Sequence, residues 1–134
     1  MTGMTSLLLF AAWTLALMSI YVGYRVALVL TFKKPANSWT RGTTPPDPAF
    51  ITRASHAHLN CVENLPIYAV IVLAATAMGK TDVVNQLACA FLLARLAQST
   101  VHLISANAMA VFIRANLFVV QVGLMGYMLW SLLN

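Results

Sequence analysis

Carboxylate side chains are scarce in this sequence: Asp47, Glu63 and Asp82 are the three acidic residues among 134, and only 8% of all residues are charged. Soluble domains contain about 25% charged residues, so this composition excludes an ordinary soluble enzyme or binding module. Of the three carboxylates, only Glu63 falls inside an apolar segment. A charge within a membrane is costly and usually functional, so Glu63 is the first candidate for a site residue.

Cysteine is rarer still, with only Cys61 and Cys89 in the chain. Their spacing matches no zinc or haem motif, so no metal site is expected. We expect both thiols to be small buried apolar groups. A redox or nucleophilic role for Cys61 stays open, because it neighbours a row of polar residues. The basic residues form no continuous patch on a soluble module, so nucleic acid is not an expected partner.

Apolar residues are abundant, at 60% of the chain with a mean hydropathy of +0.80. Four apolar stretches each have the roughly 20 residues that a helix needs to cross the hydrocarbon core. Uninterrupted runs of this length are typical of helices and not of barrel strands. We therefore predict one all-α integral membrane domain, residues 1–134, with spans at about 7–32, 56–78, 83–104 and 110–133.

The connections between the spans predict an up-down bundle and its orientation. Short connections near 79–82 and 105–109 make the last three spans antiparallel neighbours. Residues 33–55 are rich in proline and form the long loop. Four basic residues cluster there: Lys33, Lys34, Arg41 and Arg53. The opposite connection offers only Lys80, so the positive-inside rule places loop 33–55 in the cytoplasm and both termini on the other side.

Polar residues share one face of the second span when successive residues are placed 100° apart: Arg53, His56, Asn60, Glu63 and Asn64. The third span contributes a similar group: Arg95, Gln98, Ser99 and His102. Arg114 in the fourth span and Arg25 in the first complete the set. Apart from Arg95, which is closer to the midplane, the intramembrane members of this set lie in the half of the bilayer next to loop 33–55.

Two interpretations of this convergence remain open. In one, a hydrogen-bonded network fixes the helix register, with a structural ion pair between Glu63 and Arg95 at its centre. In the other, the site binds a ligand. One carboxylate cannot neutralise four cations, which are Arg25, Arg53, Arg95 and Arg114. The surplus positive charge favours an anionic ligand that enters from the cytoplasm, with the Asn60 and Asn64 amides as further contacts.

The segment His56–Pro66, with the sequence His-Ala-His-Leu-Asn-Cys-Val-Glu-Asn-Leu-Pro, resembles a known signature. It is similar to Arg-Ala-His-x-Asn-x-x-Glu-Asn-x-x-Pro of the membrane-associated proteins in eicosanoid and glutathione metabolism (MAPEG). Arg53, Ala94–Ala97 and Ile113–Arg114 extend the similarity along the chain. The chain most resembles bacterial-type members similar to microsomal glutathione transferases, which implies a homotrimer in a bacterial inner membrane.

The resemblance also implies an activity. Glutathione would be the co-substrate, held between subunits by polar side chains that include Asn60, Glu63 and Arg114. Arg114 would be catalytic, because an adjacent guanidinium favours the thiolate form of a thiol. Lipophilic electrophiles or lipid hydroperoxides would arrive from the membrane lipids. The further residues expected at the glutathione site are Arg25, Arg53, His56, Asn64, Gln98 and His102.

Several positions depart from the family pattern. His56 and Leu59 stand where some relatives carry Arg, Gln98 and His102 replace a His and a Tyr, and Ala115 and Phe118 replace a Ser and a Tyr. These departures favour the alternative, a non-catalytic lipid-binding or scaffold protein of the same fold.

Overall fold

Four long helices make up the computed structural model, which describes residues 1–40, 42 and 47–134. They are α1 (Gly3–Leu30), α2 (Ala49–Ala77), α3 (Asp82–Ile104) and α4 (Ala108–Leu133), and the short 3-10 helix η1 (Ala36–Trp39) follows α1. Each of the four is long and apolar enough to cross a membrane, and the described residues contain no strand. The predicted all-α fold with four spans is therefore confirmed.

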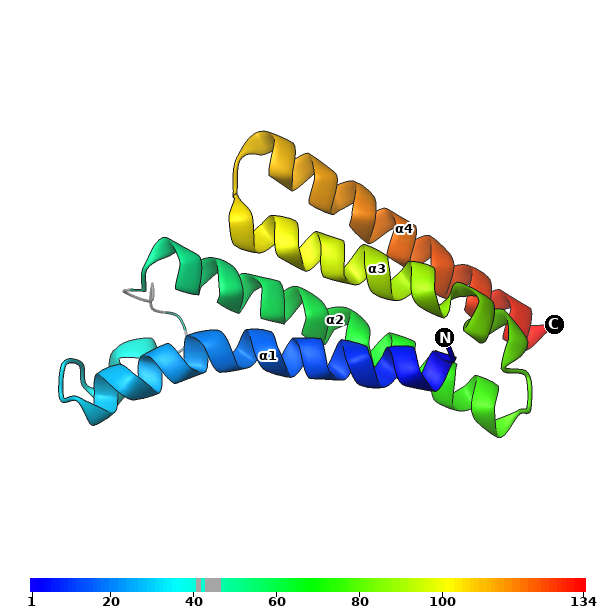
Figure 1. Cartoon of the computed structure of the whole chain (residues 1–134), viewed down its shortest axis with the longest axis horizontal. Helices are drawn as coiled ribbons and strands as arrows, with labels where there is room; N and C mark the ends of the chain where they lie inside the picture. Colours follow the sequence, from blue (N-terminus) through cyan, green and yellow to red (C-terminus); the bar gives the residue numbers. More distant parts are fainter. Residues whose placement is uncertain (41, 43–46) are drawn as a thin grey trace.

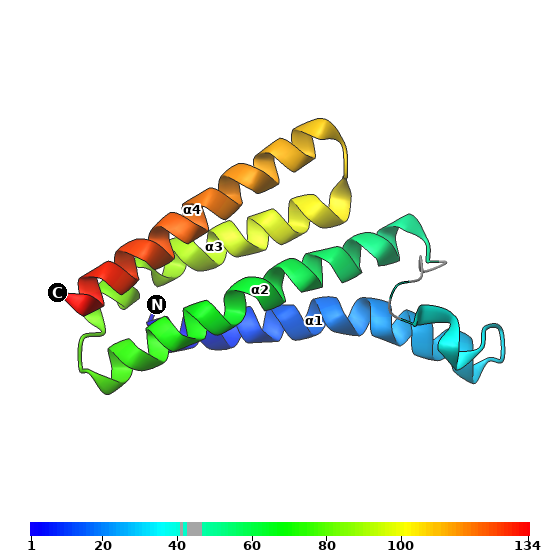
Figure 2. The same ribbon diagram turned by 180° about the vertical axis from the view of Figure 1, so that it is seen from behind.

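The helices form two antiparallel hairpins, α1 with α2 and α3 with α4, which lie side by side (Figure 1). Both termini and the α2–α3 connection lie at one end of the bundle, and the other two connections lie at the opposite end (Figure 2). We call this opposite end, with residues 31–40, 47–48 and 105–107, the basic end, because Lys33 and Lys34 lie there. Arg41, which also entered the orientation argument, lies outside the described residues.

The second helix begins earlier than the sequence analysis predicted. It starts at Ala49 and not at 56, so the loop is shorter than the predicted 33–55. The helix starts directly after Pro48, whose carbonyl accepts a hydrogen bond from the backbone N–H of Thr52 at 3.0 Å. Residues 49–65 contain no proline or glycine, and Ile51 and Ala54 in the first turns are already buried. Arg53 is therefore a helical residue.

Aromatic side chains join three helices in the core. The rings of Tyr68 on α2 and Phe91 on α3 stack with centroids 3.9 Å apart, and Phe10 on α1 meets Phe91 edge-on at 5.8 Å. The Tyr68 hydroxyl forms a hydrogen bond of 2.5 Å with the hydroxyl of Ser6 on α1. Burial of a phenolic O–H requires such a partner. This cluster fixes α1, α2 and α3 relative to one another.

The two cysteines differ in their surroundings. Cys61 is fully buried, as predicted, and its Sγ lies 3.5 Å from the Oγ of Ser99. Cys89 is exposed, which corrects the expectation that both are buried. The reason is its position on α3, where it faces away from the neighbouring helices while Ala88, one residue earlier, is fully buried.

Candidate functional site

A hollow of about 380 Å3 lies between α2, α3 and α4 near the basic end. Four polar residues that the sequence analysis selected line it: Asn60, Glu63, Gln98 and Arg114. Its apolar lining comes from α4: Val111, Ala115, Phe118 and Val119. The hollow thus presents an amide pair, a carboxylate and a guanidinium beside an apolar wall. We call it the polar hollow.

Glutamine side chains hold the Arg114 segment of α4 against α3. Gln98 donates from Nε2 to the carbonyl oxygen of Arg114 at 3.3 Å, and Gln121 donates from Nε2 to Oε1 of Gln98 at 3.0 Å. Gln121 is fully buried and lies one heptad after Arg114, a spacing that is visible in the sequence. The Nη1 atom of Arg114 is buried without a hydrogen-bond partner among the described residues. This guanidinium therefore retains hydrogen-bonding capacity for a ligand.

Asn60 connects the polar hollow to the end of α3. Its Nδ2 lies 3.2 Å from Nδ1 of His102, and its backbone carbonyl accepts a hydrogen bond from Nη1 of Arg95 at 3.2 Å. The His102 ring lies 6.2 Å from that of His56, measured between centroids. His102 is buried and His56 is exposed. His102 thus orients Asn60 from outside the polar hollow.

Glu63 and Arg95 do not form the predicted ion pair. Glu63 is exposed and lines the polar hollow, whereas Arg95 is fully buried and its guanidinium lies 5.2 Å from the ring centroid of Phe10. No oxygen of Glu63 lies within 4.0 Å of an Arg95 nitrogen, and Arg95 instead donates to the backbone carbonyl of Asn60. Among the described residues, the salt bridge found is between Arg25 and Asp47. Arg95 retains two buried nitrogens, Nε and Nη2, without hydrogen-bond partners.

Three other predicted site residues lie outside the polar hollow. Arg25 donates from Nε and Nη2 to Oδ2 of Asp47, at 3.0 and 2.7 Å. Arg53 donates from Nε to the carbonyl of Leu103 at 2.8 Å, which fastens the start of α2 to the end of α3. Asn64 is buried and lines a separate apolar trough between α2 and α4. In this single chain, none of the three lines the polar hollow.

Comparison with known proteins identifies the family. The MAPEG family model matches residues 4–134, which is nearly the whole chain. The chain belongs to the MAPEG family. Together with its four apolar helices, this makes it an integral membrane protein. No curated protein and no solved structure matched the chain.

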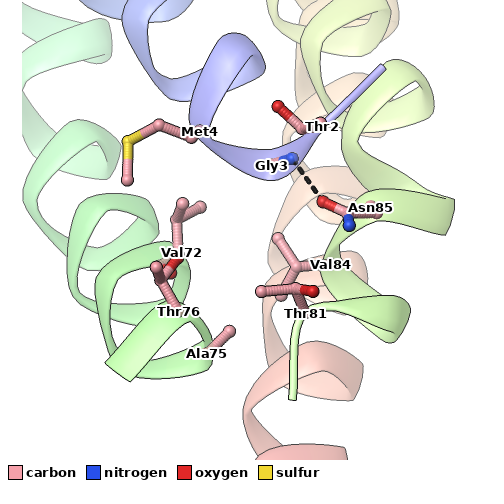
Figure 3. Close-up of a pocket in the computed structure, with 9 residues that line it drawn as sticks. All are labelled: Thr2, Gly3, Met4, Val72, Ala75, Thr76, Thr81, Val84 and Asn85. Carbon is pink, nitrogen blue, oxygen red and sulfur yellow. Dashed lines mark hydrogen bonds between the residues drawn. The ribbon is translucent and has the colours of Figure 1, made fainter. Parts of the chain in front are cut away.

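This MAPEG chain has a second hollow, of about 260 Å3, at the end opposite the polar hollow. Figure 3 shows the residues that line it. Gly3 and Asn85 meet there, and the Gly3 N–H donates to Oδ1 of Asn85 at 2.7 Å. Its other lining residues are threonines and apolar residues, with no ionisable side chain. Elsewhere in the described ranges, no three His, Cys, Asp or Glu side chains gather into a possible metal site. Of these two hollows, the polar hollow is the one lined by ionisable side chains, those of Glu63 and Arg114.

Proposed function

We propose that this MAPEG chain is a glutathione-dependent transferase or peroxidase that acts on lipophilic electrophiles or lipid hydroperoxides at the cytoplasmic face of the membrane. Glutathione carries two carboxylates, an ammonium group and amides, and the polar hollow offers chemical complements to them. Arg114 suits a carboxylate or a thiolate, Glu63 suits the ammonium, and Asn60 suits a peptide amide.

The observation that carries this proposal is the state of Arg114. Its guanidinium lines the polar hollow, and its buried Nη1 has no partner in the described chain. An unpaired buried donor on a cationic group is unfavourable, and an anionic ligand would remove that cost. A thiolate is such an anion, and a nearby guanidinium stabilises it relative to the thiol. Arg114 can therefore bind glutathione and also activate it.

The reaction would mainly require that glutathione and the lipophilic substrate are held next to each other. Glutathione supplies the sulfur nucleophile, and a lipophilic substrate reaches the polar hollow along the apolar side chains of α4, which include Val111 and Phe118. Holding the two reactants at the boundary between water and lipid lowers the entropic barrier. Arg114 would stabilise negative charge on the attacking sulfur.

A homotrimer fits the exposed parts of the site. Glu63 is exposed on a membrane-spanning helix, where contact of its carboxylate with lipid would be costly. Val111, Phe118 and Val119, which border the polar hollow on α4, are exposed as well. A second copy of the chain packed here would cover the carboxylate and enclose the polar hollow. We therefore include the homotrimer in the proposal.

Calorimetric titration of the detergent-solubilised protein with glutathione tests the proposal. The Arg114→Leu variant should bind glutathione at least about tenfold more weakly, since a hydrogen bond to a charged group contributes about 1.5–3 kcal/mol. Arg114→Lys should recover part of the affinity, because it restores the charge without the planar fork. Lys33→Leu is the matched control, since it removes a positive charge at the basic end outside the polar hollow.

Conjugation of a hydrophobic electrophile should fall most in Arg114→Leu and less in Arg114→Lys, and it should stay unchanged in Lys33→Leu.

One structural observation favours the alternative of a lipid-binding scaffold. Ala115 and Phe118 line the polar hollow without a hydroxyl group that could assist the thiol. A wild-type protein that gives no heat with glutathione, yet retains lipid through purification, would replace the transferase proposal with the scaffold.

A further inference from the structure

The Arg114 segment of α4, residues 111–120, has no apolar anchor in the bundle. None of these ten residues, all of which the structure describes, is buried. The second half of α4 differs, because Met125, Met128 and Leu132 belong to the hydrophobic core. Apolar packing therefore fixes the second half of the helix, whereas other contacts must set the position of the Arg114 segment.

One hydrogen bond joins the Arg114 segment to another helix within the described chain. Nε2 of Gln98 on α3 donates it to the carbonyl oxygen of Arg114 at 3.3 Å. Gln98 is buried, and its Oε1 accepts a hydrogen bond from Nε2 of Gln121 at 3.0 Å. We call Gln98 and Gln121 the glutamine pair. The pair connects the buried half of α4 to the backbone at Arg114.

Gln121 fixes the orientation of the Gln98 amide. Its Nε2 also donates to the carbonyl of Leu117 at 2.9 Å, so both hydrogens of this nitrogen are used. Exchanging the nitrogen and the oxygen of Gln121 would bring its oxygen against two acceptors. Gln121 therefore presents a donor to Gln98, and Nε2 of Gln98 is directed to Arg114. Burying an amide inside a membrane-spanning helix is costly, which favours a functional role for it.

We propose that Gln121 is a positioning residue of the glutathione site: acting through Gln98, it holds Arg114 where the guanidinium meets the glutathione sulfur. The inference rests on the proposed function. Gln98 and Arg114 line the polar hollow, whereas Gln121 is not part of its lining. A second copy of the chain would contact the exposed side of the Arg114 segment, and the glutamine pair would set the distance of that segment from α3. A misplacement of about 1 Å can lower a rate about 100-fold, so this distance matters for catalysis.

The test measures the thiolate absorbance of glutathione bound to the detergent-solubilised protein as a function of pH. Gln121→Met replaces the amide with an apolar group of similar length. The thiolate fraction at neutral pH should fall about three- to tenfold, the value of one neutral hydrogen bond. Its pH dependence should move to higher pH, because a more distant guanidinium stabilises the thiolate less. Glutathione affinity should change less than in Arg114→Leu, since Glu63 and Asn60 still line the polar hollow.

A double variant tests whether Gln121 acts through Gln98. Gln98→Met should lower the thiolate fraction at least as much as Gln121→Met does. Adding Gln121→Met to Gln98→Met should cause no further loss, because the connection to Arg114 is already broken. Gln121→Asn provides a second variant should the methionine protein not fold. It keeps an amide but is one methylene shorter, so it should also lose the thiolate signal.

Two controls separate positioning from stability. Met128→Ala should lower the unfolding temperature, because it leaves a cavity beside a fully buried position of α4, but it should keep the wild-type thiolate signal. Asn116→Leu should keep both, because Asn116 is exposed and its Nδ2 bonds to the Phe112 carbonyl of its own helix.

The outcomes distinguish this inference from the proposed function. A wild-type thiolate signal that is unchanged in Gln121→Met, or a further loss in the double variant, would overturn the inference and leave the transferase proposal. Glutathione that binds the wild type without a thiolate signal would also overturn the inference, since Arg114 would then not face the sulfur. A wild type that binds no glutathione in calorimetry would overturn the proposed function and this inference with it.

Discussion

Gly3 lies where the bundle leaves no space for a side chain. A Cβ atom at this position would lie 2.5 Å from Cγ1 of Val84, which is 1% exposed. The bond from the Gly3 N–H to Asn85 keeps the start of α1 close to α3 (Figure 3). Gly3→Ala is therefore expected to destabilise the protein by about 1–3 kcal/mol through overpacking. Unfolding in a single detergent, followed by helical circular dichroism, measures the change.

Gly123→Ala provides the matched control. A Cβ at Gly123 would meet nothing within 4 Å, and this glycine lies inside α4. Alanine should therefore stabilise the helix by about 0.5–1 kcal/mol. Adding Val84→Ala to Gly3→Ala should ease the crowding, so the pair should cost less than the sum of the two single changes. A Gly3→Ala protein as stable as the wild type would contradict the close approach.

Individual site residues were predictable to different degrees. Helical periodicity and similar depth were sufficient to bring Asn60, Glu63, Gln98 and Arg114 together from sequence. The same periodicity grouped Asn64 with them, because the sector of the helix that contains Asn60 and Glu63 also contains Asn64. The Asn64 side chain nevertheless lines a different space. The partner of Arg25 was not predictable, because Asp47 lies in a connection whose path is not encoded by any periodic pattern.

Two helices end in the same way, with the residue after the cap in a left-handed conformation. Phe32 has a φ of 55° after α1, and Gly79 has a φ of 68° after α2. In both cases the next backbone N–H donates to a carbonyl five residues earlier at 2.9 Å, as in a Schellman motif. Glycine adopts this conformation without cost, whereas a side chain opposes it by about 1–2 kcal/mol.

Exchanging the residue type at these two ends should have opposite effects. Phe32→Gly should stabilise the protein by about 1 kcal/mol, because glycine adopts the left-handed conformation without strain. Little packing is lost, since the Phe32 side chain is 96% exposed. Gly79→Ala should destabilise it by a similar amount. The two variants are compared by thermal unfolding in one detergent. A lower stability of Phe32→Gly would show that lipid or a partner subunit contributes more to the Phe32 ring than its backbone costs.

The connection after α1 is fastened to that helix by Asp47. Its carboxylate accepts hydrogen bonds from Arg25 at Oδ2 and from the indole N–H of Trp39 at Oδ1, the latter at 2.8 Å. The Arg25 guanidinium also lies 5.0 Å from the ring centroid of Tyr21. A buried acceptor with two donors, one of them charged, should stabilise the folded connection.

Asp47→Asn should therefore destabilise the protein by about 1–3 kcal/mol, because it leaves the Arg25 cation without its counter-ion. Cleavage between residues 31 and 48 by an added protease should become faster. Asp82→Asn is the control, since Asp82 is exposed at the opposite end. Unchanged cleavage together with unchanged unfolding would show that the salt bridge does not hold the connection.

The four helices were predictable from hydropathy, but the start of α2 was not. A hydropathy pattern reports apolar content, and the first turns of α2 are mixed, with Arg53 and His56 beside buried Ile51 and Ala54. Such an amphipathic beginning has no long apolar run. The proline at 48 is the signal that marks the boundary, because a helix can begin directly after it.

At the scale of the whole molecule, the polar groups are unevenly distributed along the bundle. The polar hollow and the Arg25–Asp47 salt bridge lie toward the basic end, whereas the hollow around Gly3 at the other end has no ionisable lining. The up-down order of the helices (Figure 1) produces this asymmetry, since it brings the polar halves of α2, α3 and α4 to the same end. The site and the basic connection should therefore face the same compartment.

The orientation of the bundle in the membrane gives the last prediction. The basic residues around the first connection should keep that end in the cytoplasm. Asn37→Cys in η1 and Thr81→Cys before α3 lie at opposite ends of the bundle, and each is introduced into a chain with Cys61 and Cys89 replaced by serine. In intact cells, a membrane-impermeant maleimide should label only the Thr81→Cys protein, and both after the membrane is opened. Labelling of both in intact cells would contradict the four-span arrangement, and labelling of Asn37→Cys alone would reverse the orientation and place the polar hollow away from cytoplasmic glutathione.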